Sequence, residues 1–531
     1  MTERPVDLSS LPSYQAPRRS LFSARKFALM ASVVAGLGVA VYGFSPSQRP
    51  VDVFTTAAHA QVNNEVRKVE KPVGFADIVE RVKPSVISVK ININEKTSSK
   101  EDGANKDEDS PFQPGSPMER FFKRFGGPDG LPPGMRGPRG GRGPVTGQGS
   151  GFFISADGYA VTNNHVVDGA DKVEITMDDG KSYSAKVIGT DPRTDVALIK
   201  VAGRTDFPFA KLSDSKPRIG DWVLAVGNPF GLGGTVTAGI VSASGRDIGN
   251  GPYDDFIQID APVNKGNSGG PAFDTSGEVM GVNTAIYSPS GGSVGIAFSI
   301  PASTVKSVVA QLKEKGSVSR GWIGVQIQPV TSEIADSLGL KKAEGALVAE
   351  PQANGPAAKA GIESGDVITS VNGEPVKDAR ELARTIGGLA PGNSVKLNVV
   401  HKGQDKVINL TLGQLPNTVE AKADIGKGDG GSVTKDADVP KLGLKVAPAN
   451  SVAGAGKDGV VVTEVDPKSA AAERGFKEGD VILEVASKSV ANAGDVREAI
   501  NAARADNKNS VLMRVKSGGS SRFVAVPLAK G

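Results

Sequence analysis

Short apolar segments separated by turn residues make up most of the chain beyond residue 147. Phe152–Ser155 and Tyr159–Thr162 flank Ala156-Asp157-Gly158, which predicts two strands joined by a hairpin turn. Further short apolar runs, each bounded by turn residues, are Val173–Met177, Val196–Val201, Trp222–Val226, Phe256–Ile259, Val279–Val282 and Gly295–Ile300. Many short strands at turn spacing predict antiparallel β-barrels, whereas Pro301–Lys315 has its apolar residues on one helical face and predicts a helix.

The last third of the chain contains an internal repeat. Gly345–Glu350 recurs as Gly459–Glu464, and Gly361 recurs as Gly475, so both pairs are offset by 114 residues. A constant offset over separate motifs indicates a duplicated domain. The polar, glycine-rich residues between the copies are typical of a flexible linker.

These patterns predict a mainly β chain of several domains. We assign residues 1–71 to an export signal and flexible lead-in, 72–318 to the first folded domain, 319–415 and 440–531 to the two repeats, and 416–439 to their linker. Inside the first domain, residues 95–146 are so rich in charge, glycine and proline that they predict a disordered loop. Its Met118–Phe125 segment has three phenylalanines among charges, which predicts a docking patch or a small local cluster.

Composition excludes several kinds of site. The chain has no cysteine, so disulfides, thiol nucleophiles and thiolate metal ligands are excluded, and its three histidines are far apart in the sequence. We therefore predict no metal and no cofactor. The net charge of +4 is spread over both signs, and no basic stripe predicts a nucleic-acid partner.

The N-terminus has the pattern of an export signal. Four basic residues between positions 18 and 26 precede an uncharged, largely apolar stretch from Phe27 to Phe44. Ala58-His59-Ala60 has the small-x-small form of a cleavage site, but the apolar stretch is also just long enough to anchor the chain in a membrane. The sequence therefore predicts an exported protein that is either cleaved or retained as an anchored protein.

Three short motifs carry the candidate chemistry. His165 follows a strand, Asp195 opens an apolar strand, and Ser268 lies in the turn Gly266–Pro271. A serine hydroxyl needs a base to accept its proton, histidine suits that role, and a buried carboxylate fixes the imidazole tautomer. The turn also fits the nucleophile elbow of α/β-hydrolases, but that fold needs the order Ser, acid, His. The order His, Asp, Ser is that of chymotrypsin-like barrels, so His165, Asp195 and Ser268 are the predicted catalytic triad.

The glycines of this turn also predict an oxyanion hole. Glycine lets neighbouring backbone N–H groups turn toward one point, where a tetrahedral oxyanion would form. We assign the hole to the amides of Gly266 and Ser268, with the Asn267 peptide shaping it.

From about Val82 to its C-terminus the chain resembles the HtrA/DegP (Do-like) family of bacterial envelope proteases. The resemblance rests on Thr162–Val166, Thr194–Ala197, Gly266–Gly270 and both repeats. It implies a trypsin-like double β-barrel serine protease domain, with residues 95–146 as its regulatory loop, followed by two PDZ domains. It also implies an ATP-independent serine endopeptidase that degrades unfolded or damaged envelope proteins, has chaperone activity, and forms homo-oligomers of trimers and their multiples. The location it implies is the periplasm, reached in soluble form or, alternatively, anchored in the inner membrane and facing the periplasm.

Two recognition regions follow from this resemblance. PDZ domains add a peptide to a sheet edge and hold its terminal carboxylate with backbone amides, so exposed C-terminal peptides are expected partners. The carboxylate loop of the first repeat is Arg320-Gly321-Trp322-Ile323-Gly324. Its counterpart, Lys441-Leu442-Gly443-Leu444, lacks the leading Arg-Gly pair, which makes peptide binding there less certain. Alternatively, either PDZ domain serves only for packing between subunits.

The residues expected to form pocket walls are uncharged throughout Val279–Ile300. Ile286, Ile296 and Phe298 are the predicted substrate-pocket residues, and they favour cleavage after small or medium apolar residues over Lys or Arg. Alternatively, these three residues simply belong to core strands.

Two other functions remain alternatives. The first is a non-catalytic chaperone or PDZ scaffold that has kept a protease fold, and the complete triad argues against it as the sole role. The second is an esterase acting on small molecules, which the chain order and the two peptide-binding modules disfavour.

Overall fold

The computed structural model describes residues 74–93, 145–416 and 437–528, apart from residues 232, 250, 290, 291, 440, 441, 453 and 507. The predicted export signal, the Met118–Phe125 segment and most of the predicted linker lie outside the described residues. In the ranges that are described, no helix is both long and apolar enough to cross a membrane.

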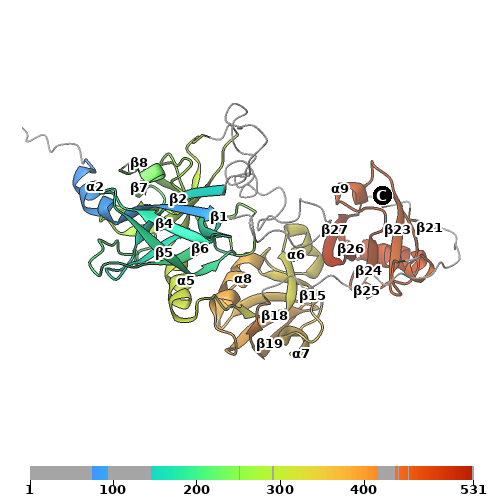
Figure 1. The fold of residues 1–531 in the computed structure, drawn as a ribbon. Coiled ribbons are helices and arrows are strands. Elements are labelled where there is room, and N and C mark those ends of the chain that lie inside the picture. The colour runs from blue at the N-terminus through green and yellow to red at the C-terminus, as the bar shows by residue number, and fades with distance from the viewer. Residues whose placement is uncertain are drawn as a thin grey trace, which may run out of the picture. The chain divides into compact units, whose positions relative to one another are not determined.

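Six antiparallel strands close the first barrel, in the order β1-β2-β3-β6-β5-β4 (Figure 1). They are β1 (Val86–Ile93), β2 (Val145–Phe153), β3 (Tyr159–Asn163), β4 (Lys172–Thr176), β5 (Ser182–Asp191) and β6 (Val196–Val201), with α2 (Ala76–Val82) and η1 (Lys83–Ser85) before β1 and α4 (Asn164–Val167) after β3. The predicted hairpin joins β2 to β3, where Phe152 pairs with Val161. Because β2 begins at Val145, the last two residues of the predicted 95–146 loop belong to a strand.

A second closed barrel follows, in the order β10-β11-β12-β9-β8-β7. Its elements are β7 (Trp222–Gly227), η4 (Pro229–Gly231), β8 (Thr235–Arg246), β9 (Phe256–Ile259), β10 (Pro271–Phe273), β11 (Val279–Ile286), β12 (Ala297–Pro301) and then α5 (Ala302–Lys315). The buried face of α5, which includes Val305 and Leu312, shares one hydrophobic cluster with Phe152 of the first barrel and Phe273 of the second. The predicted helix is therefore present, and its apolar face packs against both barrels.

The first repeat forms a sheet in the order β14-β15-β16-β18-β19, with β17 paired to β16. Its elements are β13 (Gly321–Trp322), β14 (Val325–Pro329), α6 (Ser332–Leu338), β15 (Ala346–Pro351), α7 (Pro356–Lys359), β16 (Val367–Val371), β17 (Glu374–Pro375), α8 (Ala379–Gly388), β18 (Ser394–His401), β19 (Gln404–Thr411) and β20 (Gly413–Gln414). The cluster at its core includes Leu382 and Ile386 of α8 together with Val348 and Ile368 of the sheet.

The second repeat has the same design, in the order β21-β22-β23-β24-β26-β27, with β25 paired to β24. Its elements are β21 (Ala437–Val439), β22 (Leu444–Pro448), η5 (Ala449–Ser451), β23 (Val460–Val465), α9 (Ala470–Glu473), β24 (Val481–Val485), β25 (Lys488–Ser489), α10 (Ala493–Ala505), β26 (Ser510–Ser517) and β27 (Ser520–Pro527). Leu347 pairs with Val367 in the first repeat, and Val461 pairs with Val481 in the second. Strand β21 is an addition, because it falls at the end of the predicted 416–439 linker.

Burial of α5 predicts a large stability effect at Leu312, whose side chain is fully buried. We expect Leu312→Ala, in a Ser268→Ala background that prevents autolysis, to lower the free energy of unfolding of the protease domain by about 2–5 kcal/mol. Urea unfolding followed by circular dichroism measures this. Glu314→Ala, on the exposed face of the same helix, should change stability by less than about 0.5 kcal/mol. Equal effects of the two changes would contradict the packing described.

Candidate active site

Asp195 is the most completely buried charged residue of the site, with no exposed surface. Its Oδ1 accepts the backbone N–H of His165 at 3.0 Å, and its Oδ2 lies 2.7 Å from His165 Nδ1. The same Oδ2 accepts the hydroxyl of Thr284. A buried carboxylate is costly unless donors surround it, and these three donors meet that requirement. In this geometry a neutral imidazole donates its Nδ1–H to Asp195, which leaves Nε2 as the nitrogen that can accept a proton.

The backbone of Asp195 is held in a conformation that few residues adopt. Its φ is +58°, in the left-handed region, which costs a non-glycine residue about 1–2 kcal/mol. Its carbonyl oxygen accepts hydrogen bonds from Asn163 Nδ2 at 2.9 Å and from the Asn164 amide at 3.1 Å. These bonds tie the turn before β6 to the end of β3, immediately before His165.

Ser268 lies in the turn that enters β10, and Thr284 of β11 connects it to Asp195. Ser268 Oγ is 3.5 Å from the carbonyl oxygen of Thr284, whose hydroxyl bonds to Asp195. The carbonyl oxygen of Ser268 accepts the backbone N–H of Ser150, on β2, at 2.8 Å. The structure therefore brings the three predicted triad residues to one place, with donors from both barrels.

The predicted oxyanion turn is shaped by Gly266. Its φ is +94°, and a Cβ on this residue would lie 2.6 Å from Cβ of Pro229, so only glycine fits. The Asn267 amide donates to the carbonyl oxygen of Asn264 at 3.1 Å. Among the backbone hydrogen bonds of the described residues, none has the amide of Gly266 or Ser268 as its donor. These two amides are the ones assigned to the oxyanion hole.

The buried hydroxyl of Ser150 fixes the same turn from the first barrel. It donates to the carbonyl oxygen of Gly266 at 2.6 Å and accepts the backbone N–H of Asn228 at 2.9 Å. One hydroxyl thus orients the peptide that joins Gly266 to Asn267. The sequence does not mark Ser150 or Thr284 as functional, because neither stands in a recognisable motif.

The three predicted pocket residues do not form a single group. Ile286 of β11 belongs to the core of the second barrel, whereas Phe298 of β12 belongs to the cluster shared with α5, and Ile296 packs against that cluster. Ile286 and Phe298 are both buried. The Val279–Ile300 segment carries no charged residue, and the individual pocket assignments stay predictions.

The loop predicted to bind peptide carboxylates begins with a residue that is already paired. The guanidinium of Arg320 is buried and makes two bonds to the carboxylate of Asp191, at 2.9 and 2.5 Å. Thr194, next to Asp195, also donates its hydroxyl to Asp191. Arg320 lies over the ring of Tyr253, 4.9 Å from its centroid, and burial raises the pKa of the Tyr253 phenol. The remaining loop residues, Gly321, Trp322, Ile323 and Gly324, lead into β14.

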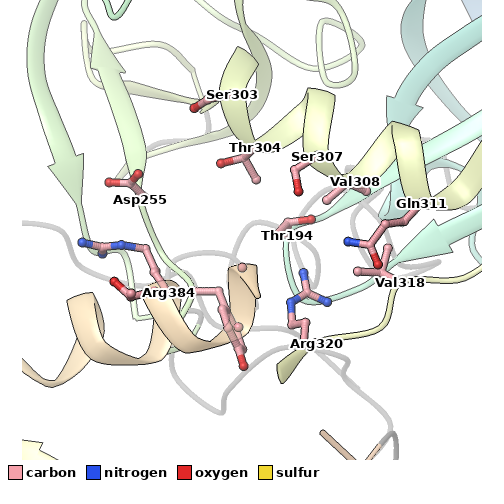
Figure 2. Close-up of a pocket in the computed structure, with 14 residues that line it drawn as sticks. Thr194, Asp255, Ser303, Thr304, Ser307, Val308, Gln311, Val318, Arg320 and Arg384 are labelled. Carbon is pink, nitrogen blue, oxygen red and sulfur yellow. The ribbon is translucent and has the colours of Figure 1, made fainter. Parts of the chain in front are cut away.

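A cavity of about 390 Å³ lies beside this ion pair (Figure 2). Figure 2 shows Thr304 and Ser307 of α5 on one side and Arg320 and Arg384 on the other, with Thr194 between them. Neither His165 nor Ser268 lines it. This cavity is therefore separate from the candidate catalytic residues.

Comparison with known proteins agrees with this architecture. Residues 149–282 match the trypsin-like peptidase domain family, and residues 321–412 and 440–528 each match the PDZ domain family. The chain is 53% identical over 472 residues to a protein of Brucella suis named "Probable periplasmic serine endoprotease DegP-like", covering 86% of this chain and 90% of that one. It is 48% identical over 499 residues to a Rhizobium meliloti protein of the same name, covering 90% and 97% of the two chains.

A solved structure is also similar. The structure of "HtrA-type protease AlgW with tripeptide" is 35% identical in sequence, covers 65% of this chain and 98% of its own, and has a TM-score of 0.52. Fold and matches together define a trypsin-like serine endopeptidase that carries two PDZ domains. More narrowly, the chain belongs to the HtrA/DegP family of serine endoproteases, as its sequence motifs predicted.

The contacts of Ser150 predict a catalytic rather than a binding defect when its hydroxyl is removed. Ser150→Ala leaves the Gly266 carbonyl and the Asn228 amide without their partner, so the oxyanion turn loses its anchor. We expect kcat to fall by about 10- to 100-fold with KM nearly unchanged, somewhat less than direct loss of an oxyanion donor. Steady-state cleavage of a fluorogenic peptide measures both constants.

The control for Ser150→Ala is Ser85, a buried serine whose hydroxyl bonds to the backbone three residues before it. Ser85 donates its hydroxyl to the carbonyl oxygen of Val82 and is also buried, so Ser85→Ala tests the cost of a lost buried hydroxyl alone. A rise in KM without a fall in kcat, or equal effects of the two changes, would show that Ser150 does not orient the turn.

Proposed function

We propose that the chain cleaves peptide bonds by acyl transfer through Ser268. The observation that supports this most directly is the network around Asp195, which bonds to His165 and, through Thr284, reaches Ser268. In the proposed reaction His165 Nε2 accepts the Ser268 proton as Oγ attacks the peptide carbonyl carbon. The tetrahedral oxyanion accepts hydrogen bonds from the amides of Gly266 and Ser268. His165 then protonates the leaving amine as the C–N bond breaks. In deacylation His165 accepts a proton from water as the water oxygen attacks the acyl carbon, and returns that proton to Ser268 Oγ as the bond from Oγ to the acyl carbon breaks.

For specificity we propose cleavage after small or medium apolar residues. The uncharged Val279–Ile300 segment supports this, because a Lys or Arg side chain would find no counter-charge along it. Ile286, Ile296 and Phe298 are the residues of this segment that we propose for the pocket.

The proposed substrates are unfolded or damaged proteins of the cell envelope, degraded without ATP. Unfolded chains offer extended segments along their whole length, whereas folded proteins are cut mainly at exposed loop tips. PDZ domains, in addition, bind exposed C-terminal peptides. The sequence contains no G-x-x-x-x-G-K-[ST] motif for binding ATP phosphates. Chaperone activity, through retention of unfolded chains, is the second role that we propose. The relatives named above are described as periplasmic, which supports the periplasm as the location, with anchoring in the inner membrane as the alternative.

The nucleophile is tested by Ser268→Ala. We expect the parent protein to degrade casein without ATP, and the variant to lose at least about 10³-fold in rate, because no other group can form the acyl-enzyme. Gel-based and fluorescence assays measure the loss, and light-scattering of an aggregating client measures chaperone action by the variant. Full casein cleavage by Ser268→Ala would rule out the proposed mechanism.

We also propose a homo-oligomer, with a trimer as its unit. The protease domain exposes Ile219 (69%) and Trp222 (52%), and the ring of Phe75 meets Trp222 edge-on at 5.3 Å. Large apolar side chains gathered on a surface are typical of protein interfaces.

Charge at this surface should therefore disrupt assembly. We expect Ile219→Glu combined with Trp222→Glu to lower the mass measured by light scattering from a multiple of the chain mass to that of one chain. Val407→Glu, at an exposed apolar position on β19, is the matched control and should leave the mass unchanged. An unchanged oligomer in the double variant would place the interface elsewhere.

A further inference from the structure

The two PDZ sheets differ at one edge. In the first PDZ domain, β14 is the first strand of the sheet and pairs with β15. In the second, the corresponding strand β22 pairs with β23 on one side and with β21 on the other. Strand β14 directly follows the predicted carboxylate loop of the first domain, and β22 begins at Leu444, the last residue of the predicted loop of the second. Within the described residues, no further strand pairs with β14, whereas β21 pairs with β22. The side chains of Gln326 and Gln328 on β14 bond to the backbone of β27 in the second domain, but the backbone edge of β14 stays unpaired.

This edge is where a PDZ ligand adds as an extra strand. Because the ligand's terminal carboxylate lies at the loop that precedes the strand, the ligand must run antiparallel to that strand. Its last residue then lies beside the first residue of the strand.

Strand β21 has the direction and register of such a ligand. It runs antiparallel to β22, with Val439 opposite Leu444 and Ala437 opposite Val446. The last residue of β21 is thus beside the first residue of β22. The carbonyl oxygen of Val439 accepts the backbone N–H of Leu442, an amide of the predicted carboxylate loop, at 3.0 Å.

The side chain of Val439 is buried where a ligand's last side chain would be. It is 1% exposed and belongs to the core cluster that includes Val496 and Ile500 of α10. Strand β21 also contacts α10, so it lies between this helix and β22.

We propose that the peptide site of the second PDZ domain is occupied in cis by the chain's own Ala437–Val439 segment, with Val439 in the place of a ligand's C-terminal residue. The competing ligand class is a peptide with a free C-terminus whose last residue is a small aliphatic one. External peptides then bind the unpaired edge of the first domain, and reach the second only when β21 leaves. This inference rests on the proposed role of the PDZ domains in peptide binding.

The short connection explains why the Ala437–Val439 segment binds in preference to a free peptide. Only residues 440–443 separate β21 from β22. A short connection gives the attached segment an effective concentration of about millimolar or more, above the concentration of ordinary free peptides.

A disulfide test reports the position of β21 directly, because the chain has no cysteine of its own. Asp438 and Lys445 are opposite each other in the register, and Cα atoms of such pairs are about 4.5–5.5 Å apart, which a disulfide can span. We expect the full chain with Ser268→Ala, Asp438→Cys and Lys445→Cys to form an intrachain disulfide on mild oxidation. The control pairs Asp438→Cys with Lys488→Cys on β25, an exposed position on a strand that pairs with β24, and should not form one.

Each outcome of this test decides the proposal. A disulfide-linked dimer on a non-reducing gel would show that a second copy supplies the strand, and would overturn occupation in cis. No disulfide in the Asp438–Lys445 pair, or equal yields in both pairs, would overturn it as well.

Peptide binding tests the consequence. The probe is a fluorescein-labelled hexapeptide with the sequence of residues 434–439, Thr-Lys-Asp-Ala-Asp-Val, and a free carboxylate. We expect Val439→Asp to increase affinity for this probe in the second domain at least ten-fold, measured by polarisation. Ala437→Pro removes a backbone N–H of β21 and leaves the side chain of Val439 unchanged, and should have the same effect if Val439→Asp folds poorly. Unchanged affinity in both variants would contradict the proposal.

The two PDZ sites are distinguished by tryptophan fluorescence. Trp322 lies in the loop of the first domain, and the second domain contains no tryptophan. The chain's other tryptophan is Trp222, so in a Trp222→Phe background a change of tryptophan emission on binding is assigned to the first domain. Casein cleavage by the parent, measured separately, reports on the proposed protease function, so failure of that function leaves the disulfide result interpretable.

Discussion

The site depends on one requirement, that the buried carboxylate of Asp195 be fully hydrogen-bonded. Its donors come from different places: His165 from the first barrel and Thr284 from the second. Neither barrel alone supplies them all, so the charge is tolerated only where the two barrels meet. The packing of α5 against both barrels, through residues such as Leu312, holds that junction together. The geometry of the candidate catalytic residues therefore depends on the association of the two barrels.

The sequence was sufficient for a mainly β chain with barrels, because short strands and turn residues are local signals, and the constant repeat offset revealed the duplicated domain. The trypsin-like and PDZ assignments came from the resemblance to the HtrA/DegP family. The sequence also marked His165, Asp195 and Ser268, which the structure brings to one place, because each has a motif of its own. The sequence did not indicate a role for Ser150 or Thr284, and the reason is physical. Each acts through partners far away in the sequence, and neither has a local pattern that distinguishes it from an ordinary strand residue.

The same distinction explains β21. Three residues at the end of a polar linker have no strand periodicity, and they become a strand only because β22 offers an unpaired edge. Duplication therefore produced two domains with the same elements but different accessibility. In the first, no further strand pairs with β14, whereas in the second β21 pairs with β22 and Val439 is buried against α10. The sequence repeat therefore predicts the strands and helices that the two domains share, but it does not predict whether another strand pairs with β14 or β22.

The ion pair between Arg320 and Asp191 limits where the protease domain can be separated from the first PDZ domain. Sequence boundaries suggest that the protease domain ends at residue 318, which separates Arg320 from it. A fragment that ends there would keep a buried Asp191 carboxylate without its guanidinium, four residues before Asp195. Removing one partner of a buried ion pair destabilises a protein by about 3–5 kcal/mol. The functional boundary of the protease domain thus includes the first residues of the domain that follows it.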